Sequence, residues 1–252
     1  MTQLDGVEIF TRWWRPAEDD GPVLVFLHDG LGCTDSLRDF PDALAGALGL
    51  GAFGYDRWGY GRSAARPELP VDLMEDCAAR LPRLLEAAGI DDYAVIGHSD
   101  GGTIALLHAM TNPPGLHATV SIAAHVHDDD ASTARLARHG TMAAAGKAPD
   151  WLVRFHGEKA RATRLMAEWV RVWRASFDAG WDLTERLGEI QGPLLALHGA
   201  ADDYGLAGQL ATIAAAVPHA ETLLLPGLGH FPHLEDEAAV VTRVAEFLRP
   251  LI

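Results

Sequence analysis

Short apolar runs alternate with amphipathic stretches along most of the chain. We predict that the apolar runs form strands, at residues 7–14, 23–27, 51–55, 93–96, 118–124, 194–198 and 222–225. The intervening patterns predict helices at residues 36–48, 73–88, 103–110, 206–217 and 235–248. Residues 16–22 are rich in turn formers, and Pro82 should kink or break the second helix. Apolar strands that alternate with helices indicate an α/β fold, with a mostly parallel sheet covered by helices on both faces.

This alternation is interrupted between residues 126 and 189, where no clear strand pattern is present. Residues 159–177 are amphipathic, with Leu165, Trp169 and Trp173 on one helical face. Strand and helix patterns resume after residue 190. We therefore predict a helical insertion at 126–189, which divides an α/β core into a first part, 1–125, and a second part, 190–252.

The composition narrows the classes of partner. With 252 residues, 48% of them hydrophobic, the chain can bury a full core, and no apolar stretch approaches the length of a membrane span. A formal net charge of −15 repels phosphate backbones and anionic lipids, so we expect neither nucleic acid nor a membrane as a partner. Two cysteines indicate no disulfide framework, and a cytoplasmic location is expected. We expect a monomer or homodimer that acts on a small-molecule substrate.

The strongest candidate for chemistry is the pentad Gly-His-Ser-Asp-Gly at residues 97–101. A predicted strand precedes it and a helix-compatible run follows it, which is the context of a nucleophile elbow. In such a turn strain lifts the serine hydroxyl clear of the backbone. Gly97 and Gly101 are required there because a Cβ at either position would collide across the turn. The pattern therefore makes Ser99 a candidate nucleophile.

A serine nucleophile needs a base and an acid, and both follow predicted strands later in the chain. Asp202 lies just after residues 194–198, and His230 lies in a glycine-rich loop after residues 222–225. The alternative for the acid is its neighbour Asp203, and the alternative for the base is the nearby histidine His233. Two further histidines, His28 and His98, are expected to have structural roles.

Four sequence blocks carry a resemblance: residues 27–32, 55–63, 97–102, and the pair 198–202 with 229–230. Occurring in this order, they are highly specific, and over essentially its whole length the chain resembles the α/β-hydrolase family. The resemblance implies the α/β-hydrolase fold, with a small helical cap inserted after the sixth strand. It also implies that Ser99 is the nucleophile, that His230 is the general base and then acid, and that Asp202 orients His230. No cofactor and no metal are implied.

The same resemblance implies an oxyanion hole made of backbone amides. One amide belongs to the residue after the nucleophile, Asp100, and the second to Gly30, with Leu31 as the alternative because Asp29 departs from the family's common pattern. The implied activity is hydrolysis of a small carboxylic ester, lactone or thioester through an acyl-enzyme. C–C bond hydrolases and cofactor-free haloperoxidases share these parts and stay as alternatives.

The side chain of Asp100 bears on the substrate. The elbow is similar to that of the valacyclovir hydrolase group, in which the acidic residue after the nucleophile recognises a substrate α-amino group. The alternative is a solvated or arginine-paired carboxylate at the edge of the pocket. The other candidate substrate-binding residues are Asp29, His125, Trp151, Trp169 and Trp173.

Two readings from other classes are weighed against the serine hydrolase. His125, His127 and Asp129 superficially match the His-x-His-x-Asp ligand motif of zinc hydrolases, but the motif's sixth position holds Asp130 instead of histidine. The fold could also serve a non-catalytic ligand-binding protein, since a fold does not fix a function. The complete set of serine, acid and histidine favours catalysis.

Overall fold

The computed structural model of the chain describes residues 1–16, 21–205 and 207–252. The turn-rich prediction at 16–22 and the predicted helix start at Leu206 fall wholly or partly outside these residues. In the described part of the chain, seven strands form one sheet in the order β3-β5-β4-β6-β7-β8-β9. Their bounds are Thr11–Arg15 (β3), Val23–Leu27 (β4), Gly51–Tyr55 (β5), Tyr93–His98 (β6), Leu116–Ile122 (β7), Leu194–Gly199 (β8) and Glu221–Leu225 (β9).

The sheet is parallel except at one edge, where β3 pairs antiparallel with β5. Every residue of β4, β5, β6 and β8 is buried, as expected for strands covered on both faces. The edge strand β9 is partly exposed. The predicted run at 7–14 is divided between β3 and a separate hairpin of β1 (Thr2–Leu4) and β2 (Val7–Ile9).

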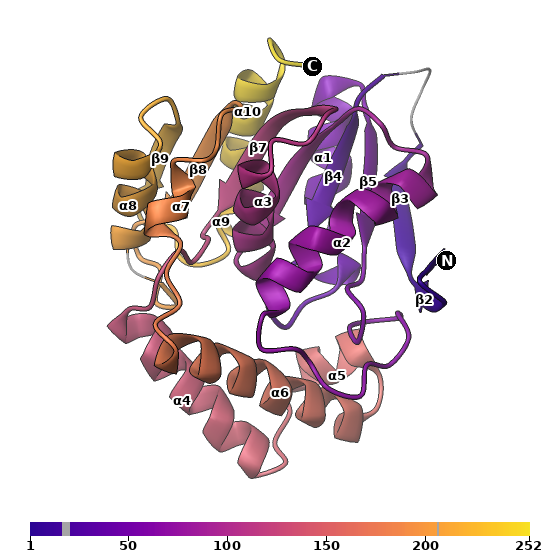
Figure 1. Ribbon diagram of the computed structural model, residues 1–252, viewed down its shortest axis with the longest axis vertical. Helices are drawn as coiled ribbons and strands as arrows, with labels where there is room; N and C mark the ends of the chain where they lie inside the picture. The colour runs from indigo at the N-terminus through magenta and orange to yellow at the C-terminus, as the bar shows by residue number, and fades with distance from the viewer. Residues whose placement is uncertain (17–20, 206) are drawn as a thin grey trace.

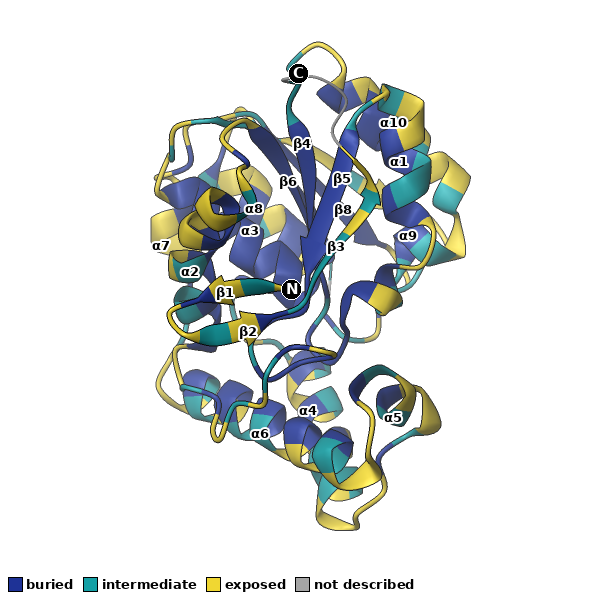
Figure 2. Cartoon of the chain, turned by 90° about the vertical axis from the view of Figure 1, so that its right-hand side faces the viewer, coloured by how far each residue is buried: buried dark blue, intermediate teal, exposed yellow. Residues whose placement is uncertain are grey.

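Helices cover both faces of the sheet (Figure 1). Helices α1 (Phe40–Leu48) and α10 (Glu237–Leu248) pack together on one face and bury one apolar cluster. Helices α2 (Leu73–Ala88), α3 (Asp100–Met110) and α8 (Gly208–Ala216) contribute to the second cluster. All residues of α3 are buried, so the helix that follows Ser99 is central to the core. Figure 2 shows the buried interior along β4, β5 and β6.

Three helices differ in detail from the predictions. The helix predicted from residue 36 begins at Phe40, because Arg38 has a φ of 51° that a helix cannot accommodate; a short 3₁₀ turn, Thr34–Leu37, precedes it. Pro82 does not break α2, which runs through it with a continuous buried face. The helix predicted at 235–248 is α10, which begins two residues later at Glu237 with the side chain of Asp236 as its cap; a separate short helix, α9 (Pro232–Glu235), precedes it.

Between β7 and β8 the described chain is helical. The helices are α4 (Asp130–Ala144), α5 (Asp150–His156), α6 (Lys159–Asp178) and α7 (Thr184–Leu187). Both α4 and α5 pack on α6, and these three lie together at one end of the sheet (Figure 1). Because β7 is the fifth strand along the chain to join the sheet, this segment follows the fifth strand and not the sixth.

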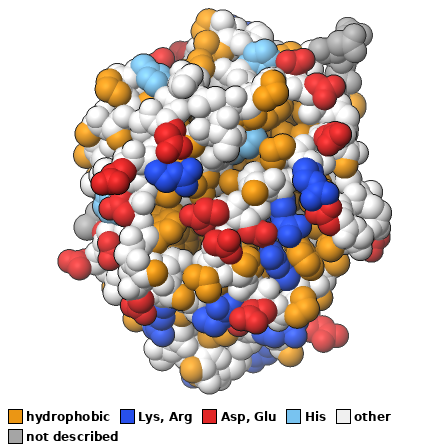
Figure 3. Space-filling view, viewed as in Figure 1, with side chains coloured by type: hydrophobic (Ala, Val, Ile, Leu, Met, Phe, Trp, Pro, Cys, Tyr) orange, Lys and Arg blue, Asp and Glu red, His pale blue; other side chains and the backbone are white. Residues whose placement is uncertain are grey.

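The surface carries charges of both signs. On the face seen in Figure 1, acidic and basic side chains are interspersed, and many of the basic ones lie in the lower half, where α4, α5 and α6 are (Figure 3). Among the described residues, no helix combines the length and the apolar content needed to cross a bilayer.

Candidate active site

Ser99 lies in the turn between β6 and α3. Its backbone has a φ of 54° and a ψ of −121°, a conformation that a residue with a side chain rarely adopts. A Cβ at Gly97 would collide with the carbonyl group of Gly101, and a Cβ at Gly101 would collide with the carbonyl group of Leu27. The two glycines and the strained serine therefore form the tight strand–turn–helix that the pentad predicts.

A continuous chain of hydrogen bonds joins Ser99, His230 and Asp202. Nε2 of His230 lies 3.0 Å from Oγ of Ser99, and Nδ1 of His230 lies 2.8 Å from Oδ2 of Asp202. If Nδ1 carries the proton and donates it to the carboxylate, Nε2 is left to accept from the serine hydroxyl. The three residues come from the ends of three different strands and meet at the same edge of the sheet.

The carboxylate of Asp202 is held in its ionised form. Burial acts to raise its pKa, but the hydrogen bond and charge of His230, with the backbone amide of Tyr204, outweigh burial and lower the pKa. Oδ1 of Asp202 accepts from the amides of Tyr204 and Gly205, at 2.8 and 3.2 Å. The carboxylate is therefore fixed on one side by backbone amides and turned toward His230 on the other.

The alternatives to Asp202 and His230 lie elsewhere. The carboxylate of Asp203 forms an ion pair with Arg135 of α4, and its side chain is 74% exposed. The ring of His233 packs against His98 with 4.5 Å between centroids, and burial holds its pKa well below the ordinary value. Neither residue takes part in the hydrogen-bond chain to Ser99.

His28 and His98 support the loops around Ser99. Nε2 of His98 donates to the backbone carbonyl of His230 at 2.7 Å, and Nδ1 of His28 donates to the carbonyl of Asp29 at 2.9 Å. Burial lowers the pKa of His98 to about 4 and that of His28 well below the ordinary value, so both are neutral. Each imidazole fixes a backbone position.

The loop at residues 28–31 is braced from below by Arg57, whose role the sequence did not reveal. Its guanidinium is buried and donates to the carbonyls of His28 and Asp29, at 2.6 and 2.7 Å. Gly30 and Leu31 follow these carbonyls and line the cavity beside Ser99. The amide of Asp100 is the first of α3 and so has no acceptor within the helix. Backbone amides from both loops are thus available next to the serine.

Asp100 is buried, with only 1% of its surface exposed. Nε1 of Trp169 donates to Oδ2 at 2.8 Å, and Nε1 of Trp173 donates to Oδ1 at 3.2 Å. Burial therefore excludes the solvated alternative; among the described residues no arginine forms an ion pair with Asp100, although the charge of Arg57 acts on it. Burial raises its pKa, opposed by the charge of Arg57 and by the two indole donors. A Cβ on Gly30 would lie 2.6 Å from Nε1 of Trp169 and 2.9 Å from Oδ2 of Asp100, so this contact needs glycine at position 30.

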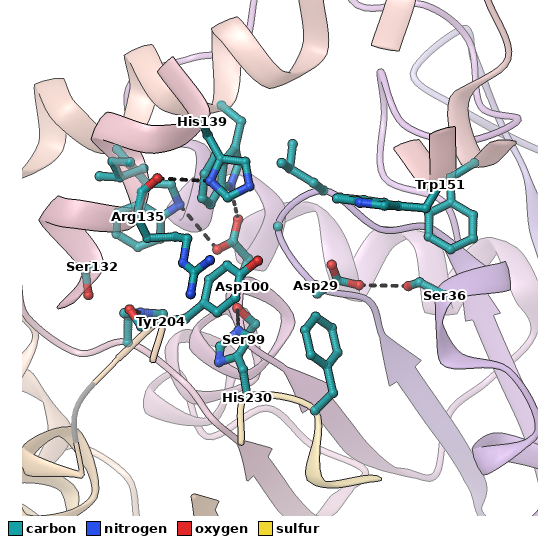
Figure 4. Close-up of a pocket in the computed structure, with 18 of the residues that line it drawn as sticks. Asp29, Ser36, Ser99, Asp100, Ser132, Arg135, His139, Trp151, Tyr204 and His230 are labelled. Carbon is teal, nitrogen blue, oxygen red and sulfur yellow. Dashed lines mark hydrogen bonds between the residues drawn. The ribbon is translucent and has the colours of Figure 1, made fainter. Parts of the chain in front are cut away.

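These groups open into a cavity of about 490 Å³. In Figure 4, Ser99, Asp100 and His230 lie at its centre, with Arg135, His139 and Tyr204 on one side and Asp29, Ser36 and Trp151 on the other. The six candidate substrate-binding residues from the sequence all line it: Asp29, Asp100, His125, Trp151, Trp169 and Trp173. Oγ of Ser36 donates to Oδ1 of Asp29 at 2.7 Å. The walls are mainly aromatic and apolar, as in many small-molecule sites.

Tyr204 and Arg135 are two site residues that sequence reasoning missed. The ring of Tyr204 lies flat on the imidazole of His230, with centroids 4.4 Å apart and 16° between the planes. The guanidinium carbon of Arg135 lies 3.9 Å from the centroid of the same Tyr204 ring. The position of Tyr204 two residues after Asp202 was a usable signal, whereas nothing local to Arg135 pointed to the site.

His125, His127 and Asp129 do not form a common ligand set. Nε2 of His125 donates to the carbonyl of Tyr204, Nε2 of His127 lies 3.1 Å from the hydroxyl of Thr212, and the Asp129 carboxylate caps α4. Within the described ranges, no group of three or more histidine, cysteine, aspartate or glutamate side chains is arranged to hold a metal ion. His125 lines the cavity, and burial lowers its pKa to about 4.

Comparison with known proteins identifies the family of this chain. The model of the family described as "Alpha/beta hydrolase family" matches residues 24–243. The chain belongs to the alpha/beta hydrolase family. This membership agrees with the parallel sheet, the covering helices and the elbow described above.

Individual relatives match this chain either over a short segment or at low sequence identity. The proline iminopeptidase of Xylella fastidiosa (strain 9a5c) is 36% identical over 95 residues, which are 37% of this chain and 29% of that protein. The match therefore spans less than a third of the relative's length. The proline iminopeptidase of Lactiplantibacillus plantarum is 22% identical over 97% of this chain and 98% of that protein. The solved enol-lactonase of Burkholderia xenovorans LB400 superposes with a TM-score of 0.75, at 20% identity and 97% coverage of both chains, which shows a shared fold.

Proposed function

We propose that this protein is a serine hydrolase that cleaves a small carboxylic ester through an acyl-enzyme intermediate. The observation that carries the proposal is the hydrogen-bond chain from Asp202 through His230 to Ser99, opening into an aromatic cavity. Nucleophile, base and orienting acid are within hydrogen-bond reach of one another, which is the geometric requirement for activating a serine. We propose that segment 126–189 is a cap over this site.

The proposed reaction has two halves. His230 takes the proton of Ser99 as Oγ attacks the substrate carbonyl carbon, and the amides of Gly30 and Asp100 hold the oxyanion. The tetrahedral intermediate collapses, the C–O bond to the alcohol breaks, and His230 gives its proton to the departing alkoxide. Water then loses a proton to His230 and attacks the acyl carbon, and Ser99 regains the proton as the acid departs. Asp202 stabilises the transient imidazolium throughout.

The carboxylates beside Ser99 support a substrate that carries a positive charge. Asp29 and Asp100 both line the cavity next to the proposed oxyanion amides. A negative side chain there opposes the charge that develops on the oxyanion, and a substrate cation between the carboxylates would remove that opposition. We therefore propose esters of small amino acids as the preferred substrates. The proline iminopeptidase relatives, whose names denote removal of an N-terminal residue, support an amino group near the scissile bond.

The test of the reaction is a panel of aryl, alkyl, lactone, thioester and amino-acid ester substrates, with a fluorophosphonate probe and peptide mapping. We expect turnover of esters and covalent labelling of Ser99 in the folded protein. Absence of labelling together with tight binding of the same esters would favour a non-catalytic binding protein. Halogenation or C–C cleavage without ester turnover would favour the corresponding alternative.

The substrate class is tested with a matched pair, a glycine ester and its N-acetylated form. Asp29→Asn should lower kcat/KM for the free amine by about 10-fold or more while the N-acetyl ester changes little, because only the free amine can make a charged contact with this carboxylate. Asp100→Asn also loses an acceptor for one of the two indole donors, so it should slow both esters, and the free amine by about 10-fold more than its N-acetyl form. An equal loss on both esters would show that neither carboxylate recognises the amine.

A further inference from the structure

Three helices of segment 126–189 each make polar contacts with a different loop of the proposed reaction centre. Helix α4 contacts the loop that carries Asp202, α5 contacts the loop that carries Gly30, and α6 contacts the first residue of the helix after Ser99. These three loops hold the acid, the oxyanion amide and the nucleophile.

Helix α4 reaches the acid loop through Arg135. Its guanidinium forms an ion pair with Asp203 and covers the ring of Tyr204 at 3.9 Å. Since the imidazole of His230 lies only 4.4 Å from the same ring centroid, Arg135 and His230 must occupy opposite faces of Tyr204. The side chain of Arg135 is 13% exposed. His230, the proposed base, therefore packs on one face of Tyr204, and Arg135 of α4 covers the other face.

Helix α5 reaches the oxyanion loop through His156. Nε2 of its imidazole donates to the carbonyl of Leu31 at 2.8 Å, and Nδ1 accepts from the amide of Gly61 at 2.8 Å. The side chain is 1% exposed, and burial lowers its pKa, which keeps the imidazole neutral. A neutral imidazole has one donor and one acceptor, and both are used to fix backbone.

Helix α6 reaches the elbow through two indoles one turn apart. Trp169 and Trp173 donate to the two carboxylate oxygens of Asp100, whose backbone amide is the proposed oxyanion donor. The pair thus fixes the orientation of the residue directly after Ser99. Because the carboxylate is buried, these bonds are stronger than the same bonds would be in water.

Several other polar contacts of the same segment end on residues 63–75, away from the reacting groups. Arg161 donates to the carbonyl of Ser63, Ser176 to the carbonyl of Val71, and Trp181 to the carboxylate of Glu75 at 3.0 Å. These contacts attach the helices to the core without touching a catalytic loop. Trp181 uses the same indole-to-carboxylate chemistry as Trp169, which makes it a matched control.

We propose that Arg135, His156 and Trp169 are positioning residues, which hold the acid, oxyanion and nucleophile loops in their reactive arrangement. This inference rests on the proposed function. Reacting groups must be held to within a few tenths of an ångström, and loops reach that precision only when other elements tie them down. The helical segment is thus part of the catalytic scaffold as well as a wall of the cavity.

The test compares Arg135→Met, His156→Phe and Trp169→Phe with the control Trp181→Phe. The substrate is p-nitrophenyl acetate, whose acetyl group is too small to depend on contacts with the cavity walls, and a fluorophosphonate probe gives an independent rate of reaction at Ser99. We expect His156→Phe and Trp169→Phe to lose about 10- to 100-fold in kcat and in labelling rate, and Arg135→Met about 3- to 10-fold, with KM nearly unchanged in all three. Trp181→Phe should stay within about twofold of wild type. His156→Gln, whose amide offers one donor and one acceptor, should recover much of the loss of His156→Phe.

Circular dichroism and thermal unfolding establish that each variant is folded. If His156→Phe or Trp169→Phe does not fold, the comparison of Arg135→Met with Trp181→Phe decides the matter, because the ion-pair partner of Arg135, Asp203, is 74% exposed and Met keeps most of the aliphatic side chain. Equal rates in the positioning and control variants, or a loss confined to KM, would overturn the inference. A wild-type protein that neither hydrolyses esters nor labels would instead refute the proposed function.

Discussion

Asp202 and Asp203 are neighbours in the chain, but their carboxylates bind partners in different parts of the molecule. Asp202 accepts from Nδ1 of His230 at 2.8 Å, and Asp203 pairs with Arg135 of α4. The first carboxylate is buried and the side chain of the second is 74% exposed. The two adjacent acids therefore contact different partners, Asp202 the proposed base His230 and Asp203 the helical segment.

These different contacts predict a large loss of kcat for one aspartate-to-asparagine substitution and a small one for the other. Asp202→Asn should lower kcat by about 10⁴-fold, because an amide can present a donor to Nδ1 and so favour the wrong tautomer of His230. Asp203→Asn should change kcat by less than about fivefold, because an exposed ion pair contributes little and Arg135 also covers Tyr204. Steady-state kinetics on one ester measures both. A larger loss in Asp203→Asn would reverse the assignment of the acid.

Removal of the Ser99 hydroxyl should stop turnover while the fold is kept. Ser99→Ala should reduce kcat by at least about 10³-fold, with an unfolding midpoint near that of wild type, since alanine meets the same backbone strain. Ser121→Ala is the matched control: this serine is buried in β7 and, among the described residues, its Oγ has no partner. Ester turnover in Ser99→Ala equal to that in Ser121→Ala would exclude the serine mechanism.

We expect kcat to depend on the stacking of the Tyr204 ring on His230 and not on the Tyr204 hydroxyl. Tyr204→Phe keeps the stack on His230 and should retain nearly full kcat. Tyr204→Leu loses a contact of about 0.5–1.5 kcal/mol and should lower kcat by about 3- to 10-fold. Pre-steady-state acylation rates are the appropriate measurement. If Tyr204→Phe is as impaired as Tyr204→Leu, the hydroxyl is the functional group.

Gly30 should not tolerate even a methyl group. Gly30→Ala places a Cβ 2.6 Å from Nε1 of Trp169, so either the loop or the Asp100 contact must shift, and kcat should fall by about 10²-fold. Gly192→Ala, where a Cβ meets nothing within 4 Å, is the control and should be active. Full activity in Gly30→Ala would show that the oxyanion loop accommodates the shift.

The buried histidines predict a loss of stability in mild acid. Burial lowers the pKa of His98, His108 and His125 to about 4, whereas the unfolded chain binds these protons near pH 6.5. Unfolding therefore takes up protons between these values, and stability is present above about pH 6.5 and is lost as the pH falls toward 4. The expected slope is about 1.4 kcal/mol per pH unit for each histidine. Urea unfolding at pH 7, 6 and 5 measures it, and an unchanged midpoint would contradict the prediction.

Local patterns predicted the elements that form the sheet and the elbow. Strands such as β4 and β6 are apolar throughout because both of their faces are buried, and a glycine pentad between a strand and a helix has few other uses. The errors arose where the decisive factor was not local. Because Arg38 has a positive φ, α1 begins only at Phe40. Helix α2 continues through Pro82 because its buried face packs on the core.

The least predictable parts of the site join residues far apart in the chain. The bond from Trp169 to Asp100 spans 69 positions, and the carbonyl bonds from Arg57 fix a loop 28 positions away. An indole on an amphipathic helix is compatible with simple core packing, and an arginine after a strand is compatible with the surface. Only the three-dimensional arrangement reveals that both act on the loops around Ser99.

The contacts of α4, α5 and α6 have a consequence for exchanging parts between members of the family. The bonds of His156 end on backbone atoms, which any relative with the same loop can supply. The bonds of Trp169 and Arg135 instead require aspartate side chains at positions 100 and 203. A chimera that receives residues 126–189 from this protein would therefore need Asp100 grafted into its own core, whereas the exposed ion pair with Asp203 would be dispensable.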